Sequence, residues 1–185
     1  GKKTGIELPG ETPGLVPTPG KMHPNGTLEW SVPTPYSLAM GHNILATSLQ
    51  MVRAFAVIAN GGYLVDPTLV KKVVKTTQNE EKILLDHTNP DRIKKFPRVM
   101  PKEVASQVLR AMKYTTKLGG TGKLADLSGY SEGGKTGTAE KIINGVYCKN
   151  HHISSFVGVA PANLDAEIPT RFVLLVSIDD PEAII

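Results

Sequence analysis

Apolar residues recur at helical spacing in two stretches of the chain. The stripe within residues 47–62 comprises Leu49, Val52, Phe55, Ala56 and Ala59. This spacing predicts an amphipathic helix, which Thr47 and Gln50 begin as a capping box and Asn60-Gly61-Gly62 ends. A second stripe predicts a helix over residues 101–117, with Pro101 in its first turn.

Shorter apolar runs predict strands. The first candidates are residues 63–65, 69–76 and 83–85. Later runs at 132–142, 146–148, 153–160 and 172–178 predict an antiparallel meander, because Asn144-Gly145 is a strong type I′ hairpin signal. Residues 172–178 are nearly all apolar, which predicts a central strand covered on both faces. Helices followed by a meander indicate an α+β fold, an antiparallel sheet packed with helices.

Residues 1–35 lack a clear period and are rich in Pro and Gly. They predict a long irregular connection, and its length suggests that the chain begins in the middle of something larger. Pro33 and Pro35 predict that any helix starts only after Tyr36.

Composition narrows the functional classes. A chain of 185 residues with 40% apolar and 21% charged residues is typical of one soluble globular domain. The net charge of +4 is scattered and only 5% of residues are aromatic, so we expect no nucleic-acid partner. No apolar run approaches a membrane span. Cys148, the single cysteine, excludes an internal disulfide, and no His carries a partner at metal-ligand spacing, so neither a metal nor a cofactor is expected.

The candidate chemistry lies in Lys135-Thr136-Gly137-Thr138, within the predicted strand 132–142. Side chains alternate along a strand, so Lys135 and Gly137 should share one face and Thr136 and Thr138 the other. Gly137 lets a ligand or another backbone approach closely. An ammonium, hydroxyls and open backbone N–H groups favour binding of a carboxylate or a developing oxyanion.

Two other glycine-containing motifs are weaker candidates. Lys3-Thr4-Gly5 repeats the tripeptide but runs into a loop punctuated by Pro and Gly, so we assign it no catalytic role and expect it to lie far from Lys135. Residues 119–123, Gly-Gly-Thr-Gly-Lys, lack a preceding strand and the full phosphate-loop pattern. They are more typical of a helix stop, followed by a short helical turn at 122–127.

The order of five motifs resembles the C-terminal part of the transpeptidase domain of class B penicillin-binding proteins. They are residues 1–11, GKKTGIELPGE; 47–62, TSLQMVRAFAVIANGG; 119–122, GGTG; 134–139, GKTGTA; and 155–161, SFVGVAP. One departure is Gly41-His42-Asn43, where the family usually has a Gly-x-Gly turn. The resemblance implies the fold that these proteins share with serine β-lactamases.

The resemblance also implies roles for the site. Lys135 and Thr138 are expected to be catalytic, with the backbone N–H of Thr138 forming half of an oxyanion hole. Thr136, Gly137 and Thr138 are expected to bind substrate, the two hydroxyls at its carboxylate and Gly137 beside its backbone. The implied partners are the D-Ala-D-Ala end of a peptidoglycan stem peptide, β-lactams, and cell-division or elongation proteins.

The sequence contains neither Ser-x-x-Lys nor Ser-x-Asn, the two other motifs of this enzyme class. We therefore expect residues 1–185 to be the C-terminal portion of one transpeptidase domain, inactive alone and without the family's closing helix. The implied location is the periplasmic face of the bacterial inner membrane, with the anchor upstream. Two alternatives remain: a β-lactamase or penicillin sensor of the same fold, and a non-catalytic division scaffold.

Overall fold

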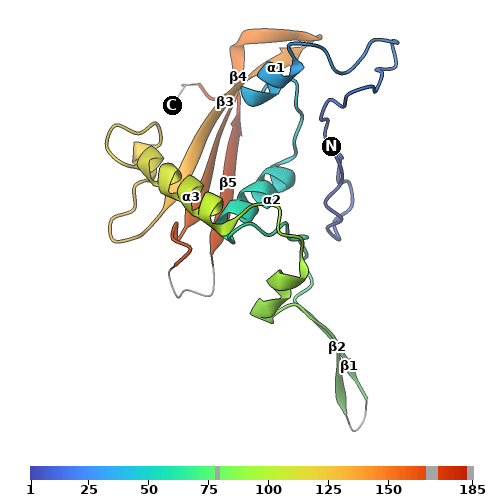
Figure 1. Cartoon of the computed structure of the whole chain (residues 1–185), viewed down its shortest axis with the longest axis vertical. Helices are drawn as coiled ribbons and strands as arrows, with labels where there is room; N and C mark the ends of the chain where they lie inside the picture. The colour runs from blue at the N-terminus through green and yellow to red at the C-terminus, as the bar shows by residue number, and fades with distance from the viewer. Residues whose placement is uncertain (78–79, 166–170, 183–185) are drawn as a thin grey trace. The chain divides into compact units, whose positions relative to one another are not determined.

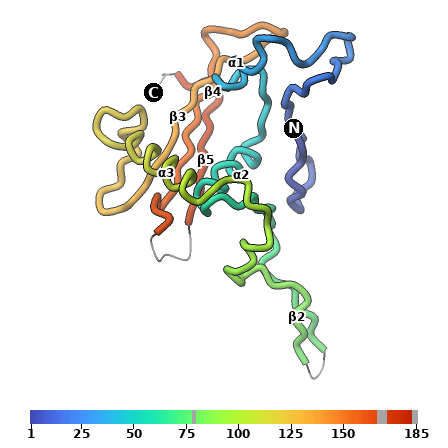
Figure 2. The backbone as a smooth tube through the Cα atoms, in the orientation of Figure 1, coloured from blue at the N-terminus to red at the C-terminus, as the bar shows by residue number. Residues whose placement is uncertain are grey.

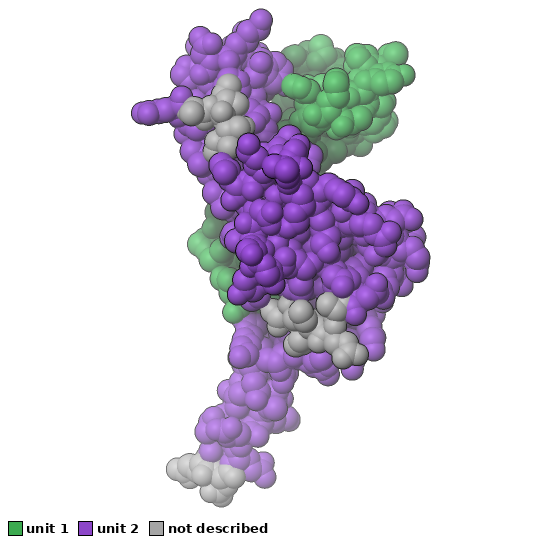
Figure 3. Space-filling model, turned by 90° about the vertical axis from the view of Figure 1, so that its left-hand side faces the viewer, with its two compact units in different colours: residues 1–51, 66–69 green, residues 52–65, 70–185 purple. Residues whose placement is uncertain are grey.

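The structure, a computed structural model, describes residues 1–77, 80–165 and 171–182. The chain divides into two units, which Figure 3 distinguishes by colour. Unit 1 holds residues 1–51 and 66–69, and unit 2 holds residues 52–65 and 70–185. The two units are described separately below.

Unit 1 is mostly irregular, as the Pro- and Gly-rich sequence predicts. Its one complete helix is α1 (Thr34–Ala39). Two isolated bridges, Leu15 with Leu45 and Met22 with Leu28, join parts of the irregular chain. The prediction that any helix starts only after Tyr36 is wrong, because Pro35 lies in the first helical turn, where a missing N–H costs nothing. At the 41–43 turn, Asn43 takes a φ of 59°, and asparagine tolerates this left-handed conformation better than most residues.

Helix α2 (Ser48–Ala59) begins with the predicted capping box. The Thr47 amide donates to Gln50 Oε1 at 2.9 Å, and the Gln50 amide donates to Thr47 Oγ1 at 3.2 Å. The Gln50 side-chain amide also donates to the carbonyls of Lys2 and Pro13, at 2.7 and 2.9 Å. The cap therefore fixes the helix start and two points of the irregular N-terminal segment within unit 1.

Unit 2 contains the predicted antiparallel meander. Its strands are β3 (Gly133–Ile143), β4 (Val146–Ala160) and β5 (Phe172–Asp179), in the order β3-β4-β5. Figure 2 shows the chain running along β3 and back along β4, and Asn144-Gly145 connects the two strands. Asn144 and Gly145 have φ values of 53° and 81°, the positive values that a type I′ turn requires. Strand β4 continues through residues 149–152, which the sequence predicted as a break.

Helix α3 (Lys102–Thr116) packs against β3 and closes the core of unit 2 (Figure 1). The buried core residues are Ala59, Leu109, Met112, Val159 and Ala162. They come from α2, α3, β4 and the segment after β4, so the apolar stripes of both helices meet one face of the sheet. Alternating side chains of β4 supply that face, with Val157 and Val159 both buried.

The segment between α2 and α3 departs most from the predicted strands. Residues 63–65 form no strand, and only Tyr63 makes an isolated bridge with Arg98. Strands β1 (Lys72–Thr76) and β2 (Glu81–Asp86) form an antiparallel hairpin, so the 69–76 strand starts later than predicted. A 3₁₀ helix, η1 (Pro90–Lys95), follows the hairpin. Proline at its start and the Asn89 side-chain cap explain this turn.

Strand β5 is not the central strand that its apolar run predicted. Within the described residues it has β4 as its only neighbour. Phe172 and Leu174 are 69% and 63% exposed. An apolar run indicates that both faces suit burial, but it does not say where in the sheet the strand lies.

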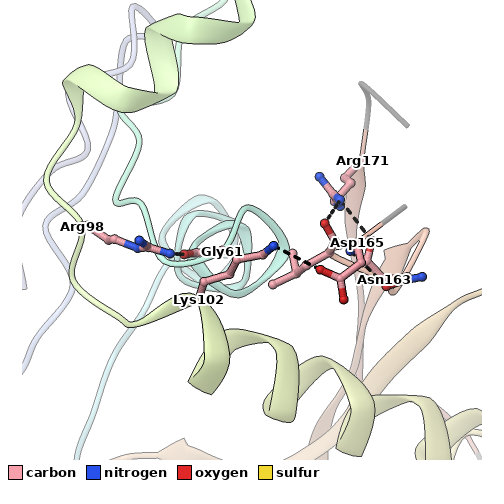
Figure 4. A network of polar contacts seen from close by, with 7 residues as sticks. Gly61, Arg98, Lys102, Asn163, Asp165 and Arg171 are labelled. Atoms are coloured by element: carbon pink, nitrogen blue, oxygen red, sulfur yellow. Dashed lines mark hydrogen bonds and ion pairs between the residues drawn. The ribbon is translucent and has the colours of Figure 1, made fainter. Parts of the chain in front are cut away.

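Polar contacts hold the segments around the core (Figure 4). The Arg98 guanidinium donates to the Gly61 carbonyl after α2, with its closer nitrogen at 3.1 Å. Lys102, in the first turn of α3, pairs with Asp165 at 3.1 Å. Arg171 donates to the backbone carbonyl of Asn163 at 3.0 Å. The first contact joins the end of α2 to the segment before α3, and the second joins the start of α3 to the segment that follows β4.

Candidate functional site

Two glycines position the Lys-Thr-Gly strand. A Cβ on Gly133 would lie 3.2 Å from the Met112 Cβ, so glycine lets β3 approach α3 closely. A Cβ on Gly134 would overlap the Phe156 ring, which covers the start of the strand. The paired glycines before Lys135 therefore allow β3 to fit between a helix on one face and an aromatic ring on the other.

The four motif residues divide between the two faces of β3, as strand alternation predicts. Lys135 lies opposite Val157 and Thr136 opposite Phe156 in the β4 register. Lys135 is therefore on the face that bears α3, and its ammonium donates to the Thr136 carbonyl at 2.6 Å. Thr136 and Thr138 share the opposite face.

A hollow of about 280 Å³ lies against the Thr136 and Thr138 face. Its polar rim includes Thr121, Thr136, Thr138, Ser154 and Ser155, and its apolar lining includes Leu124, Phe156, Val176 and Ile178. A Cβ on Gly137 would meet nothing within 4 Å. Among the described strands β3 pairs only with β4, so its other edge is available for an added strand. The hollow thus offers hydroxyl groups beside an apolar surface.

The loop between α3 and β3 contributes Thr121 to this site. Its Oγ1 lies 2.9 Å from Thr136 Oγ1. The neighbouring amides face inward: Gly120 donates to the Lys117 carbonyl at 2.8 Å and Gly122 to the Thr115 carbonyl at 2.9 Å. The 119–123 segment is therefore a helix stop that uses its amides internally, as the sequence predicted, rather than a phosphate loop. The short helix η2 (Lys123–Ala125) follows it.

A charged cluster lies directly before the strand. Glu132 is 5% exposed, and its Oε1 accepts from Thr116 Oγ1 at 3.0 Å and from Lys117 Nζ at 2.8 Å. Lys117 Nζ also donates to Asp126 at 2.6 Å. Burial alone would raise the pKa of Glu132, but the hydrogen bonds from Lys117 and Thr116 lower it below its ordinary value. The bonds to Asp126 and then Glu132 raise the pKa of Lys117, so the cluster is charged near neutral pH.

Sequence reasoning named Thr121 only as part of a glycine-rich motif and missed the charged cluster entirely. Glu132 stands in Tyr130-Ser131-Glu132-Gly133, which is polar enough to indicate an exposed turn. Its burial depends on α3 ending beside it, a tertiary relationship that no local pattern encodes. The Gly-Gly-Thr-Gly run before the Lys-Thr-Gly motif was the available signal for Thr121.

The first Lys-Thr-Gly copy has a different local structure. The amides of Thr4 and Gly5 donate to the two oxygens of Glu11, at 2.6 and 3.1 Å. Hydrogen bonds from the Thr4 side chain and backbone lower the pKa of Glu11. The copy lies in irregular chain of unit 1 rather than on a strand, with its amides already paired. Its distance from Lys135 and its lack of a catalytic role stay predictions.

The remaining titratable candidates do not form a second site. His151 pairs with Asp180 at 3.1 Å, and Lys141 pairs with the same carboxylate at 3.0 Å. Hydrogen bonds from Lys141 and then His151 lower the pKa of Asp180. Residues 1–77, 80–165 and 171–182 contain no group of three His, Cys, Asp or Glu residues arranged to hold a metal. None of the helices in these ranges has the length and apolar content needed to cross a bilayer.

Comparison with known proteins identifies the family of the chain. The family described as penicillin binding protein transpeptidase domain matches residues 1–183. The chain therefore belongs to the penicillin-binding protein transpeptidase family, and the resemblance inferred from the sequence is confirmed. The helices and antiparallel strands described above confirm the predicted α+β fold class as well.

Sequence relatives include stage V sporulation protein D of Bacillus subtilis, which is 32% identical over all of this chain and 26% of its own length. The penicillin-binding protein PbpB of Mycobacterium tuberculosis is 33% identical over 98% of this chain and 25% of its own. A crystal structure of M. tuberculosis penicillin binding protein 3 complexed with aztreonam matches with a TM-score of 0.77 and 28% identity, over 99% of this chain and 38% of that one. The chain thus spans about a quarter of the length of the curated relatives.

Proposed function

We propose that this chain forms the Lys-Thr-Gly wall of the active site of a serine D,D-transpeptidase that cross-links peptidoglycan. The observation that carries the proposal is the arrangement of residues 135–138: an end strand presents two threonine hydroxyls to a hollow of about 280 Å³. Several relatives bear the name peptidoglycan D,D-transpeptidase, including FtsI of Escherichia coli, which is 31% identical over 99% of this chain.

The reaction is acyl transfer. A serine hydroxyl attacks the penultimate D-Ala carbonyl of a stem peptide, an ester forms, and the terminal D-Ala leaves with a proton on its amine. An amine of a second stem peptide then attacks the ester, forming the cross-link and regenerating the serine. We assign the nucleophile to a segment outside residues 1–185, because these residues include no Ser-x-x-Lys.

The wall recognises and polarises the substrate. The Thr136 and Thr138 hydroxyls donate to its terminal carboxylate. The Lys135 ammonium starts from the other face of β3, where it bonds to the Thr136 carbonyl, and supplies positive charge at the strand. The backbone N–H of Thr138 is one of two oxyanion donors, a type of group worth about 3–4 kcal/mol in the transition state. Gly137 carries no side chain, so the peptide can lie along the open edge of β3 as an added strand.

β-Lactams are proposed to occupy the same hollow. The crystal structures of the M. tuberculosis relative include complexes with aztreonam and ampicillin. The proposal extends to the surroundings of the protein: stem peptides with D-Ala-D-Ala ends as substrate, division or elongation proteins as partners, and the periplasmic face of the inner membrane as location. The sporulation name of the Bacillus subtilis relative and the peptidoglycan D,D-transpeptidase name of the Escherichia coli relative support this setting.

The test labels the complete gene product with a fluorescent penicillin and locates the adduct by mass spectrometry. We expect one adduct, on a serine outside residues 1–185, that persists for many minutes. An adduct on a residue within this chain, such as Cys148, contradicts the proposal. Rapid hydrolysis of the adduct identifies a β-lactamase, and a folded protein that takes no label identifies a non-catalytic scaffold.

A further inference from the structure

The ammonium group of Lys117 contacts two carboxylates of the segment that connects α3 to the Lys-Thr-Gly strand. Lys117 is the C-cap residue of α3. Its ammonium lies 2.6 Å from Asp126 Oδ1, just after η2, and 2.8 Å from Glu132 Oε1, just before β3. The loop of residues 118–131 is thus tied to the helix end near its middle and at its exit.

The Glu132 end of this tie is buried. The side chain of Glu132 is 7% exposed, whereas the Lys117 and Asp126 side chains are each 45% exposed. A buried carboxylate needs a charged or hydrogen-bonding partner, and here Thr116 and Lys117 supply it. Within the described residues Glu132 Oε2 has no hydrogen-bond partner, so the side-chain contacts of this carboxylate are made through Oε1. Lys117 consequently has little freedom to leave this position.

The tied loop carries the residue that meets the candidate site. Thr121 Oγ1 lies 2.9 Å from Thr136 Oγ1. Gly122 sits on the ring of Phe156, because a Cβ at Gly122 would be 3.0 Å from a ring carbon. A shift of the loop would therefore move the hydroxyl partner of Thr136. The amides of Gly120 and Gly122 hold Thr121 to the end of α3 from one side. The Lys117 side chain adds a second tie, through Asp126, from the other side of Thr121.

We propose that Lys117 is a positioning residue for the site: it holds the 118–131 loop so that Thr121 orients the Thr136 hydroxyl toward the substrate carboxylate. The inference rests on the proposed function, in which Thr136 contacts that carboxylate. Lys117 touches no substrate itself. If the contacts of Lys117 served stability alone, their loss would destabilise the protein without changing how Thr136 binds its ligand. The two roles can therefore be distinguished by measuring acylation as well as stability.

The test is a double-mutant cycle in the complete gene product, with the second-order rate constant of acylation by a fluorescent penicillin as readout. Lys117→Met and Thr121→Val each remove one link between Lys117 and Thr136. We expect each to slow acylation about threefold to tenfold, the effect of one lost hydrogen bond. The double variant should be no slower than the slower single variant, because both changes break the same path.

Three further variants make the result specific. Lys117→Arg keeps the positive charge, so we expect this variant to be acylated at a rate within about twofold of the parent rate. Lys123→Met removes a neighbouring exposed lysine of η2 and should leave the rate unchanged. If Lys117→Met fails to fold, Asp126→Ala takes its place in the cycle, because it removes the exposed acceptor of Lys117 and leaves the Lys117 bond to Glu132 intact.

Two results overturn the inference while the proposed function stands. In the first, the loss of acylation rate in the double variant equals the product of the two single losses. In the second, Lys117→Met folds and is acylated at the same rate as the parent protein. If the proposed function itself is wrong, the result is different, because the parent protein is then not labelled by the fluorescent penicillin. In that case the inference, which depends on the labelled site, falls as well. A less-than-multiplicative loss together with rescue by Lys117→Arg supports the positioning role.

Discussion

The ring of Phe156 lies directly over the backbone of Gly134, one residue before the Lys-Thr-Gly motif. The same ring is 3.0 Å from the Cβ position of Gly122 and 3.3 Å from that of Gly158. Three glycines from the loop, β3 and β4 thus leave the space that one aromatic side chain fills. This contact fixes the start of the site strand against its neighbour.

Gly134→Ala is expected to destabilise the domain by about 1–3 kcal/mol, because the added methyl overlaps the ring and forces Phe156 out of its packed position. Gly137→Ala, three residues along the same strand, is the matched control, since its methyl would enter open space. We expect its stability to stay within about 0.5 kcal/mol of the parent. Urea unfolding of the domain measures both variants.

A second substitution tests the cause. Phe156→Leu should restore part of the stability lost in Gly134→Ala, because a smaller side chain makes room for the methyl. In the parent background the same Phe156→Leu change should be destabilising. Equal losses in both backgrounds would show that the ring is not what opposes a methyl group at Gly134.

Local chemistry made several parts of this structure predictable from sequence. Thr47 and Gln50 carry complementary hydrogen-bonding groups three residues apart, and the capping box forms as expected. Asn144-Gly145 supplies the two positive φ values of a tight hairpin, which sets the register of β3 with β4 and so the faces of Lys135 and Thr136. Each signal operates within a few residues, where sequence and geometry are directly linked.

Features that depend on distant neighbours were not predictable in this way. Glu132 is buried because α3 ends beside it, although its own neighbourhood is polar. The apolar run of β5 indicated a central strand, but within the described residues the strand has one neighbour. Residues 63–65 have apolar side chains without a partner strand, so they remain irregular. The sequence pattern of a segment indicates which of its side chains are suited to burial, but the neighbouring segments in the fold determine which of them are buried.

Thr47→Ala is expected to cost about 1 kcal/mol, the usual effect of losing a helix N-cap. Gln50→Ala should cost more, because Gln50 also donates to the carbonyls of Lys2 and Pro13. Ser48→Ala, inside the first turn, is the control and should change stability by less than about 0.5 kcal/mol. Urea unfolding ranks the three variants, and a larger loss for Thr47→Ala than for Gln50→Ala would contradict the second role of Gln50.

Glu132→Gln is expected to lose stability near neutral pH, where Lys117 is paired with the ionised carboxylate. The folded state lowers the pKa of Glu132 below its ordinary value of 4.5. The unfolded chain therefore binds a proton at Glu132 more readily than the folded protein does. The stabilising contribution of the ionised carboxylate is fully present above pH 4.5 and is lost as the pH falls through the pKa of the folded state. The stability gap between parent and variant should shrink below pH 4.5, as unfolding at several pH values will measure.

Asp126→Asn provides the comparison for this pH dependence. It removes the negative charge of the exposed partner of Lys117 and leaves the buried pair with Glu132 in place. We expect a smaller loss at neutral pH than for Glu132→Gln, because exposed ion pairs contribute about 0–1 kcal/mol. A gap for Glu132→Gln that stays constant down to pH 3 would mean that the carboxylate charge does not stabilise the fold.

The two Lys-Thr-Gly copies allow a matched test of the site assignment. Lys135→Ala in the complete gene product should slow penicillin acylation about tenfold to a hundredfold, because a charge-assisted contact worth about 1.5–3 kcal/mol is lost. Lys3→Ala removes the same side chain from the same tripeptide and should acylate at the parent rate. The Lys3 copy has its Thr4 and Gly5 amides paired with Glu11, whereas Gly137 beside Lys135 faces open space. Second-order acylation rates, measured on variants whose unfolding matches the parent, decide between the copies: a large loss in Lys3→Ala with no loss in Lys135→Ala would move the site to the first copy.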